Sequence, residues 1–207
     1  MNTMRAVRVE SCGGPEQMSV QVVPRLEPGP GEIRIRLSAC GINLIDTYHR
    51  SGLYPLSMPT GLGCEGAGIV EVVGDGVDDL IVGDRVGFAM AMGAYAEAIV
   101  LAQGAVVKIP EGVTDEEVAA GLLKAMTVDY LFNDTFALSG GETVLFHAAA
   151  GSVGLIACQW AKTIGVRLIG TASTEAKCEL ALSHGATECF VSGSDDVEER
   201  LRACAPA

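Results

Sequence analysis

The stretch from Glu142 to Gly154, ETVLFHAAAGSVG, restricts the possible folds of this chain more than any other part of the sequence. A short apolar run over 143–146 predicts a buried strand, a loop of small residues follows, and a helical pattern comes next. In this strand–turn–helix arrangement, the pyrophosphate of a dinucleotide lies on the helix N-terminus. The pattern therefore indicates a nucleotide-dependent enzyme rather than a passive binding module.

The loop corresponds to the dinucleotide fingerprint G-x-G-x-x-G at Ala149, Gly151 and Gly154, with alanine in place of the first glycine. Gly151 would let backbone amides approach a pyrophosphate, and Gly154 would let the helix pack closely on the strand. The loop must therefore turn without a positive φ angle at residue 149, or alanine must be tolerated there. Two of the three glycines are weak evidence for a dinucleotide site when taken alone. The residues after the second predicted strand provide further evidence.

The residues after the second predicted strand indicate which nucleotide is preferred. Proteins that bind NAD usually place an acid about 20 residues beyond the glycine loop, on the ribose hydroxyls. Here residues 171–174 read TAST, and the first acid, Glu175, falls inside the next helix. The small uncharged Ser173 together with Lys177 suits a 2′-phosphate, so NADPH is the expected cofactor. The alternative is that Lys177 is an ordinary solvated helix residue.

Two regions of the chain differ in their periodicity. Up to about residue 125, short strands alternate with glycine- and proline-rich turns, which predicts a β-rich, barrel-like domain. Its expected strands are 4–9, 18–23, 32–39, 68–73, 94–101 and 105–109. The pattern then becomes helical at Thr114, with Glu117 at the capping-box position.

The remainder alternates strands with helices, which predicts a parallel, doubly wound sheet. The expected strands are 143–146, 166–171 and 189–191, and the expected helices are 152–164, 174–184 and 195–203.

The composition excludes several classes of protein. The net charge of −12 lacks the basic excess that general nucleic-acid binding needs. No segment reaches the roughly 18 apolar residues of a bilayer span, and the N-terminus lacks a signal-peptide core, so cytoplasmic location is the default expectation. The 7 cysteines are scattered without a CxxC pair, which favours reduced thiols over disulfides or a structural zinc site.

Four stretches together resemble the zinc-free, zeta-crystallin-like quinone oxidoreductases of the medium-chain dehydrogenase/reductase superfamily. They are ACGINLIDTY (39–48), GLGCEGAG (61–68), GDRV (83–86) and HAAAGSVG (147–154). The resemblance runs through nearly the whole chain. It implies an α/β protein with an N-terminal GroES-like β-rich barrel domain over 1–125. The first half of a Rossmann doubly wound parallel sheet, a partial NADP-binding domain, follows over 126–207.

The resemblance also implies that no metal takes part. Zinc-using relatives have a cysteine ligand where Asn43 stands and a histidine where Cys64 stands. Asn43 is a poor zinc ligand. Without zinc, a substrate carbonyl must be polarised by hydrogen bonds and by its position against the cofactor.

The resemblance assigns roles to individual residues. The implied catalytic residues are Asn43, Asp46, Tyr48 and Tyr54. The implied cofactor-binding residues are Thr127, close to the nicotinamide, with Ala149, Gly151, Val153, Gly154, Ser173 and Lys177.

Other readings of these and neighbouring residues stay open. Tyr48 and Tyr54 could be packing residues, and Asp46 could only orient a neighbour. His49 is expected to be a surface turn residue rather than a general acid, and His147 a structural loop residue rather than a catalyst. Ser192 stands nearest to a family tyrosine that helps to hold the adenosine phosphate, so phosphate recognition would rest mainly on Lys177 and Ser173.

The chain ends after about the third strand–helix unit, so we expect a C-terminally truncated member of the family. Half a doubly wound sheet would expose apolar surface and invite instability or association, and a homodimer is a candidate assembly. The expected function is NADPH-dependent, zinc-independent reduction of quinones or related α,β-unsaturated carbonyls. The alternatives are an enoyl-thioester reductase and a non-catalytic nucleotide-binding protein.

Overall fold

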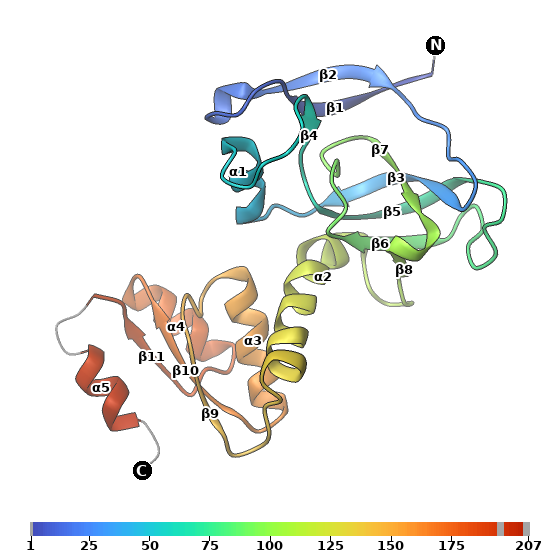
Figure 1. Ribbon diagram of the computed structural model, residues 1–207. Helices are drawn as coiled ribbons and strands as arrows, with labels where there is room; N and C mark the ends of the chain where they lie inside the picture. The colour runs from blue at the N-terminus through green and yellow to red at the C-terminus, as the bar shows by residue number, and fades with distance from the viewer. Residues whose placement is uncertain (1, 194–196, 205–207) are drawn as a thin grey trace. The chain divides into compact units, whose positions relative to one another are not determined.

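Two antiparallel sheets form the first unit of the protein, as the computed structural model shows (Figure 1). The structure describes residues 2–193 and 197–204. In spatial order, the three-stranded sheet contains β2 (Met18–Pro24), β1 (Thr3–Val9) and β4 (Thr60–Gly61). The five-stranded sheet contains β7 (Ala98–Ala102), β3 (Glu32–Cys40), β5 (Glu65–Val73), β6 (Arg85–Ala89) and β8 (Val106–Lys108). The predicted β-rich domain is confirmed.

The β5 and β7 strands differ in extent from the prediction. β5 begins at Glu65 instead of residue 68, because its first residues are a carboxylate and small side chains that show no apolar alternation. The predicted strand 94–101 is wrong at its start, since β7 begins at Ala98 and residues 94–97 contain only an isolated bridge, from Ala96 to Ala6. The backbone of this segment is bonded both to the Leu62 loop and to β1: the Tyr95 N–H donates to the Leu62 carbonyl at 2.9 Å, and the Val7 N–H donates to the Tyr95 carbonyl at 2.8 Å.

A helix that the sequence did not predict, α1 (Leu44–Ser51), follows β3. Asn43 precedes its first turn, and the Asp46 carboxylate accepts a hydrogen bond from the Asn43 N–H at 2.8 Å. The helix ends at Gly52, whose φ angle of 84° few other residues adopt. Single 3₁₀ turns at Pro15–Gln17 and Gln103–Ala105 complete the first unit.

The α2 helix (Asp115–Asp129) contains the boundary between the two units, at Leu123 and Lys124. The boundary expected between residues 125 and 126 lies in the same helix. The predicted capping box is present, since the Thr114 N–H donates to Glu117 Oε2 at 2.8 Å and the Glu117 N–H donates to Thr114 Oγ1 at 3.1 Å.

A parallel sheet with the order β11-β10-β9 forms the second unit and confirms the predicted doubly wound pattern. Its strands are β9 (Thr143–Phe146), β10 (Arg167–Ala172) and β11 (Glu188–Val191). A π-helical turn (Tyr130–Thr135) extends α2, and the other helices are α3 (Ser152–Thr163), α4 (Glu175–Ser183) and α5 (Val197–Cys204). Residues 195 and 196 of the predicted helix 195–203 lie outside the described residues.

The edge of this sheet at β9 is apolar. Within the described residues, β9 pairs with β10 alone, and Leu145 on β9 is 45% exposed. Phe136, which with Leu145 lines a hollow beside β9, is 62% exposed. The expected apolar edge of a half sheet is therefore present.

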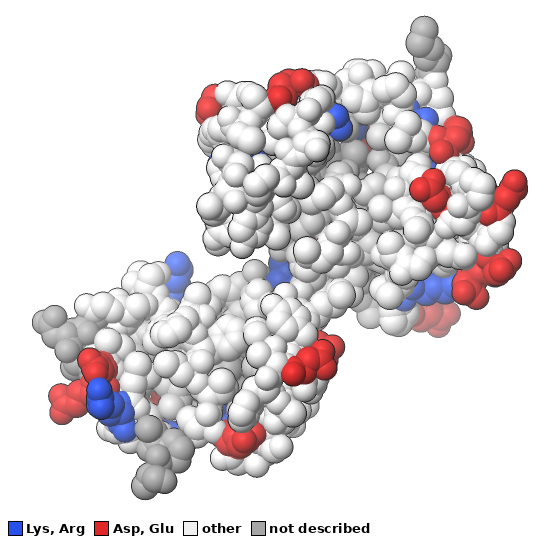
Figure 2. Space-filling model, viewed as in Figure 1, with Lys and Arg blue, Asp and Glu red and all other residues white. Residues whose placement is uncertain are grey.

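Charge is unevenly distributed over the surface. On the face drawn in Figure 2, the acidic side chains of the first unit gather mainly at its right-hand end, and most of the remaining surface is uncharged.

In the described part of the chain, no helix is both long enough and apolar enough to cross a membrane.

Candidate functional site

The loop between β9 and α3 makes a tight turn that depends on a left-handed residue. Ala148 has a φ angle of 53°, and its carbonyl accepts a hydrogen bond from the Gly151 N–H at 2.8 Å. An alanine in this conformation costs roughly 1–2 kcal/mol relative to the right-handed one. The Ala149 N–H donates to the Thr171 carbonyl at 2.9 Å, which ties the loop to the end of β10.

Two of the three fingerprint positions, Ala149 and Gly154, are buried, and the third, Gly151, is exposed. Ala149 is completely buried and keeps a negative φ angle, so the positive φ lies one residue earlier, at Ala148. A Cβ atom on Gly154 would lie 2.5 Å from the carbonyl oxygens of Ala148 and Ala149. Only glycine therefore allows α3 to begin this close to the loop.

A cavity of about 320 Å³ lies beside this loop, at the carboxyl ends of β9 and β10. Three of the predicted cofactor-binding residues line it, namely Gly151, Ser173 and Lys177. Gly151 is the N-cap of α3, and Thr174, directly after Ser173, is the N-cap of α4. The positive ends of two helix dipoles therefore lie near this cavity, which favours an anion.

Lys177 is held against Ser173 on the rim of the cavity. Its Nζ atom donates to Ser173 Oγ at 3.1 Å, and its backbone N–H donates to the Thr174 hydroxyl at 3.3 Å. Among the described residues that line the cavity, none is a carboxylate. Glu175, the first acid after β10, is the first residue of α4 and lies in its exposed first turn.

Three further polar residues of this cavity were not predicted as cofactor-binding. His147 Nδ1 lies 2.9 Å from Thr171 Oγ1, so His147 stabilises the loop, in agreement with the structural role expected for it. Ser192 Oγ donates to the Ala172 carbonyl at 2.8 Å. For Thr171 the available signal was its position at the end of the predicted strand 166–171, and for Ser192 it was its place nearest to the family tyrosine.

The other expected cofactor residues lie elsewhere in the second unit. Val153 is half-buried and packs against the hydrophobic core, and Ala149 and Gly154 are buried beneath the loop. Thr127 lies on α2 and does not line the cavity.

In the first unit, a polar cluster surrounds the start of α1. The Asn43 side chain donates from Nδ2 to Glu65 Oε1 at 2.8 Å, and Glu65 is completely buried. The second carboxylate oxygen of Glu65 accepts the Leu123 N–H at 2.8 Å. A Cβ atom on Gly41 would lie 2.2 Å from Glu65 Oε1, so glycine at position 41 makes room for this carboxylate. Glu65 was not predicted as a site residue, because it precedes the predicted strand 68–73 and nothing in its neighbours in the sequence indicates a buried carboxylate.

Asp46 is the second member of this cluster and is only 5% exposed. Its Oδ2 atom accepts hydrogen bonds from the Asn43 N–H at 2.8 Å and from the Tyr95 hydroxyl at 2.7 Å. Burial, and then the adjacent Asp46, raise the pKa of Tyr95 far above its ordinary value. Tyr95 therefore keeps its proton and acts as the donor. A cavity of about 540 Å³ is lined by Asn43, Asp46 and Tyr95 together with mainly apolar side chains.

Tyr48 and Tyr54 form an edge-to-face pair with ring centroids 5.3 Å apart. Neither lines the cavity that contains Asn43 and Asp46, and Tyr54 is 49% exposed. The expectation for His49 is wrong, because His49 lies inside α1 and is only 8% exposed, with its ring 6.1 Å from that of Tyr54.

Asn43 and Cys64 stand at the positions where zinc-using relatives have metal ligands, so their contacts with each other are relevant to metal binding. Cys64 is 1% exposed, and Asn43 Nδ2 lies 3.9 Å from its Sγ atom. The Asn43 carboxamide thus presents a donor N–H to this thiol, whereas a metal site would require an electron-pair donor. Across residues 2–193 and 197–204, no group of three His, Cys, Asp or Glu side chains is arranged to hold a metal ion.

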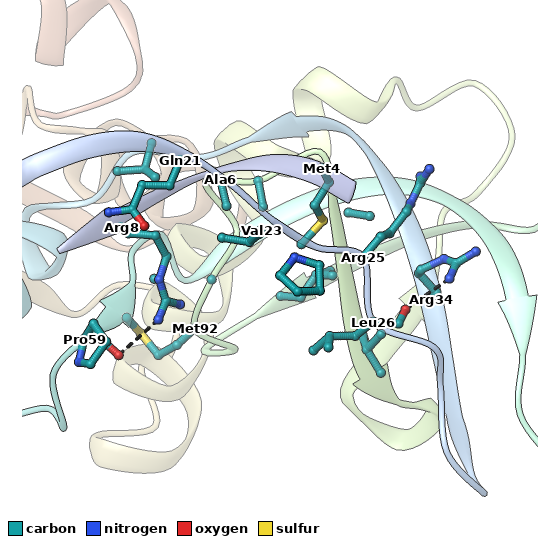
Figure 3. Close-up of a pocket in the computed structure, with 18 of the residues that line it drawn as sticks. Met4, Ala6, Arg8, Gln21, Val23, Arg25, Leu26, Arg34, Pro59 and Met92 are labelled. Atoms are coloured by element: carbon teal, nitrogen blue, oxygen red, sulfur yellow. Dashed lines mark hydrogen bonds between the residues drawn. The ribbon is translucent and has the colours of Figure 1, made fainter. Parts of the chain in front are cut away.

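A further cavity, of about 490 Å³, lies between β1, β2 and β7 in the first unit (Figure 3). Two arginines that line it donate hydrogen bonds to backbone carbonyl groups of the protein. Arg8 donates to the Pro59 carbonyl at 3.2 Å and Arg34 donates to the Leu26 carbonyl at 3.0 Å, at opposite ends of the view in Figure 3. None of the predicted site residues lines this cavity.

Comparison with known proteins follows the same division of the chain. Residues 29–111 match the alcohol dehydrogenase GroES-like domain, and residues 152–206 match the family described as zinc-binding dehydrogenase. A quinone oxidoreductase of Pseudomonas aeruginosa is 50% identical over 199 residues, which cover 95% of this chain and 61% of that protein. Quinone oxidoreductase 1 of Escherichia coli is 45% identical over 201 residues, covering 95% of this chain and 62% of that protein.

Comparison with solved structures also finds quinone oxidoreductases. The Escherichia coli quinone oxidoreductase complexed with NADPH matches with a TM-score of 0.94 and 44% identity, covering 96% of this chain and 62% of that one. The quinone oxidoreductase of Pseudomonas syringae also matches with a TM-score of 0.94, over 97% of this chain and 62% of that one. The chain thus spans about three-fifths of the length of these relatives. It belongs to the quinone oxidoreductase family of the medium-chain dehydrogenase/reductase superfamily.

Proposed function

We propose that the protein is an NADPH-dependent quinone reductase that works without zinc. The observation that carries this proposal is the contact between Lys177 and Ser173, in a cavity between two helix N-termini without a carboxylate lining it. A lysine beside a small hydroxyl residue suits the 2′-phosphate that distinguishes NADPH from NADH, whereas a carboxylate there would repel it.

The second unit contains the residues that would hold the cofactor. The N-terminus of α3 at Gly151 would accept the pyrophosphate, and Lys177 with Ser173 would hold the 2′-phosphate. Ala149, Val153 and Gly154 would shape the loop, and Thr127 is proposed to lie beside the nicotinamide. When bound, NADPH supplies the hydride.

The first unit supplies the groups proposed to act on the substrate. Reduction of a quinone carbonyl develops negative charge on its oxygen, which requires a preorganised hydrogen-bond donor. The Asn43 carboxamide can provide one, because Glu65 fixes its orientation through one N–H of Nδ2, and the other N–H faces only the thiol of Cys64, a weak acceptor. The edge-to-face pair of Tyr48 and Tyr54 offers a partly exposed aromatic surface for a flat ring.

Zinc independence rests on the chemistry of residue 43. An asparagine whose amide donates to a buried carboxylate is a poor zinc ligand. Activity should therefore be the same after dialysis against a chelator, and metal analysis of the active protein should find no stoichiometric zinc. Loss of activity that added zinc restores would contradict this part of the proposal.

The decisive experiment compares acceptors. NADPH oxidation is measured with 9,10-phenanthrenequinone and with crotonyl-CoA, alongside NADPH binding followed by cofactor fluorescence. Turnover of the quinone supports the proposal, and preference for crotonyl-CoA identifies an enoyl-thioester reductase instead. Saturable NADPH binding without turnover of either acceptor would show a non-catalytic nucleotide-binding protein.

Self-association is a separate part of the proposal. The exposed apolar edge at β9 supports a homodimer as the assembly of this chain. Light scattering after size-exclusion chromatography measures the mass in solution. The mass of two chains supports the proposed homodimer, and the mass of one chain contradicts it.

A further inference from the structure

Tyr95 is held rigidly in the first unit by contacts on three sides. Its N–H donates to the Leu62 carbonyl at 2.9 Å, and its carbonyl accepts the Val7 N–H at 2.8 Å. Its ring lies directly against Gly63, where an added Cβ atom would stand 2.5 Å from Tyr95 Cδ1. The φ angle of 84° at Gly63 also favours glycine. The position of the hydroxyl is therefore fixed by the fold.

That hydroxyl is one of two donors to Asp46 Oδ2, the other being the Asn43 N–H. The other carboxylate oxygen, Oδ1, is buried and has no hydrogen-bond partner. A carboxylate that is only 5% exposed and has so few donors depends strongly on each of them, because little of it is accessible to water that could replace a lost hydrogen bond. Tyr95 thus fixes the one carboxylate that anchors the backbone of Asn43.

We propose that Tyr95 is a positioning residue, which sets the placement of Asn43 through the carboxylate of Asp46. Asn43 is restrained twice, at its backbone by Asp46 and at its side chain by Glu65. Removing the Tyr95 hydroxyl loosens the first restraint and leaves the second unchanged. The carboxamide then still points toward Glu65, but its Cα atom and the first turn of α1 gain freedom. For catalysis, this inference rests on the proposed role of Asn43.

Two measurements on the full chain test the proposal, with Tyr95→Phe as the variant. Tyr130→Phe is the matched control, because Tyr130 is 49% exposed and lies in the second unit. The first measurement is hydrogen exchange of the Asn43 amide by NMR, which does not depend on turnover. Loss of the Tyr95 hydroxyl should speed this exchange by about tenfold, while amides of β5 keep their protection. Unchanged exchange at Asn43 would overturn the proposal, whatever the enzyme does.

The second measurement is steady-state kinetics with 9,10-phenanthrenequinone. Tyr95→Phe should lower kcat by about tenfold and leave the KM for NADPH unchanged, since a small misplacement affects the reacting geometry and not the cofactor. In an Asn43→Ala background the same change should have less than about a twofold effect, because the two residues act through one path. Equal losses in both backgrounds would overturn the proposal. Absence of turnover in the unmodified chain would overturn the proposed function and leave the exchange result to decide the role of Tyr95.

Discussion

The methyl group of Ala149 lies against the bare backbone of Gly170, because a Cβ atom placed on Gly170 would stand 2.6 Å from the Cβ of Ala149. Ala149 occupies the first glycine position of the dinucleotide fingerprint. The sheet accommodates the extra methyl group by having no side chain on β10 at the facing position. Alanine in the loop and glycine in the strand therefore form one packed pair.

This pairing predicts an asymmetric effect of added methyl groups. Gly170→Ala should lower the free energy of unfolding by about 1–3 kcal/mol, because the new methyl would overlap Ala149 and approach Cys189 Sγ. Ala149→Gly in the same chain should recover part of that loss. Gly104→Ala is the control, since nothing lies within 4 Å of the added atom. Urea denaturation of the four proteins measures the effect, and equal stabilities of Gly170→Ala and Gly104→Ala would refute the pairing.

Asn43 should contribute to turnover and not to cofactor affinity. Asn43→Ala removes the proposed donor to the substrate oxygen, so kcat with 9,10-phenanthrenequinone should fall by on the order of 100-fold. The Kd for NADPH should be unchanged, because the proposed cofactor residues belong to the second unit. Asn133→Ala, at an exposed position on the π-helical turn, is the control. A similar kcat in both variants would exclude Asn43 from the chemistry.

Asp84 should make part of the stability dependent on pH. The Ile81 N–H, donating to Asp84 Oδ2 at 3.0 Å, and then Lys108, at 2.9 Å, hold the pKa of this carboxyl below its ordinary value. A depressed pKa in the folded state adds stability above the unfolded pKa, and this stability is lost as the pH falls through the folded pKa. Because Lys108 is 57% exposed, the contribution should be only about 0.2–1 kcal/mol.

Thermal unfolding of the unmodified chain and of Asp84→Asn, compared from neutral to acidic pH, measures this contribution. The unmodified chain should be the more stable at neutral pH, and the two curves should converge in acid. A difference that is constant over the whole range would show that the Asp84 charge does not matter.

The second unit could be predicted almost completely from the sequence, because its signals are local. The apolar run at β9, the glycines at 151 and 154, and the residues that follow β10 each determine structure within a few positions of themselves. The exception is the left-handed conformation of Ala148, which an alanine in the sequence does not predict.

The cluster in the first unit could be predicted only in part. The α1 helix buries Asp46 and His49 and exposes Leu44, which is the reverse of the usual amphipathic pattern, so the sequence did not indicate which side of this segment is buried. The partner of Asp46, Tyr95, is 49 residues away in the chain and lies within the predicted strand 94–101, ahead of the observed start of β7 at Ala98. Contacts of this kind follow from the tertiary fold and not from local sequence.

The central claim is that Lys177 and Ser173 recognise a 2′-phosphate, and the most direct test is a titration with both cofactors. NADPH and NADH are titrated against the unmodified chain, Lys177→Ala and the control Lys162→Ala, which removes a charge from the exposed side of α3. Lys177→Ala should weaken NADPH binding by about 1–3 kcal/mol, or roughly 5- to 150-fold in Kd, and leave NADH binding nearly unchanged. Equal losses for both cofactors, or the same loss in Lys162→Ala, would contradict the account.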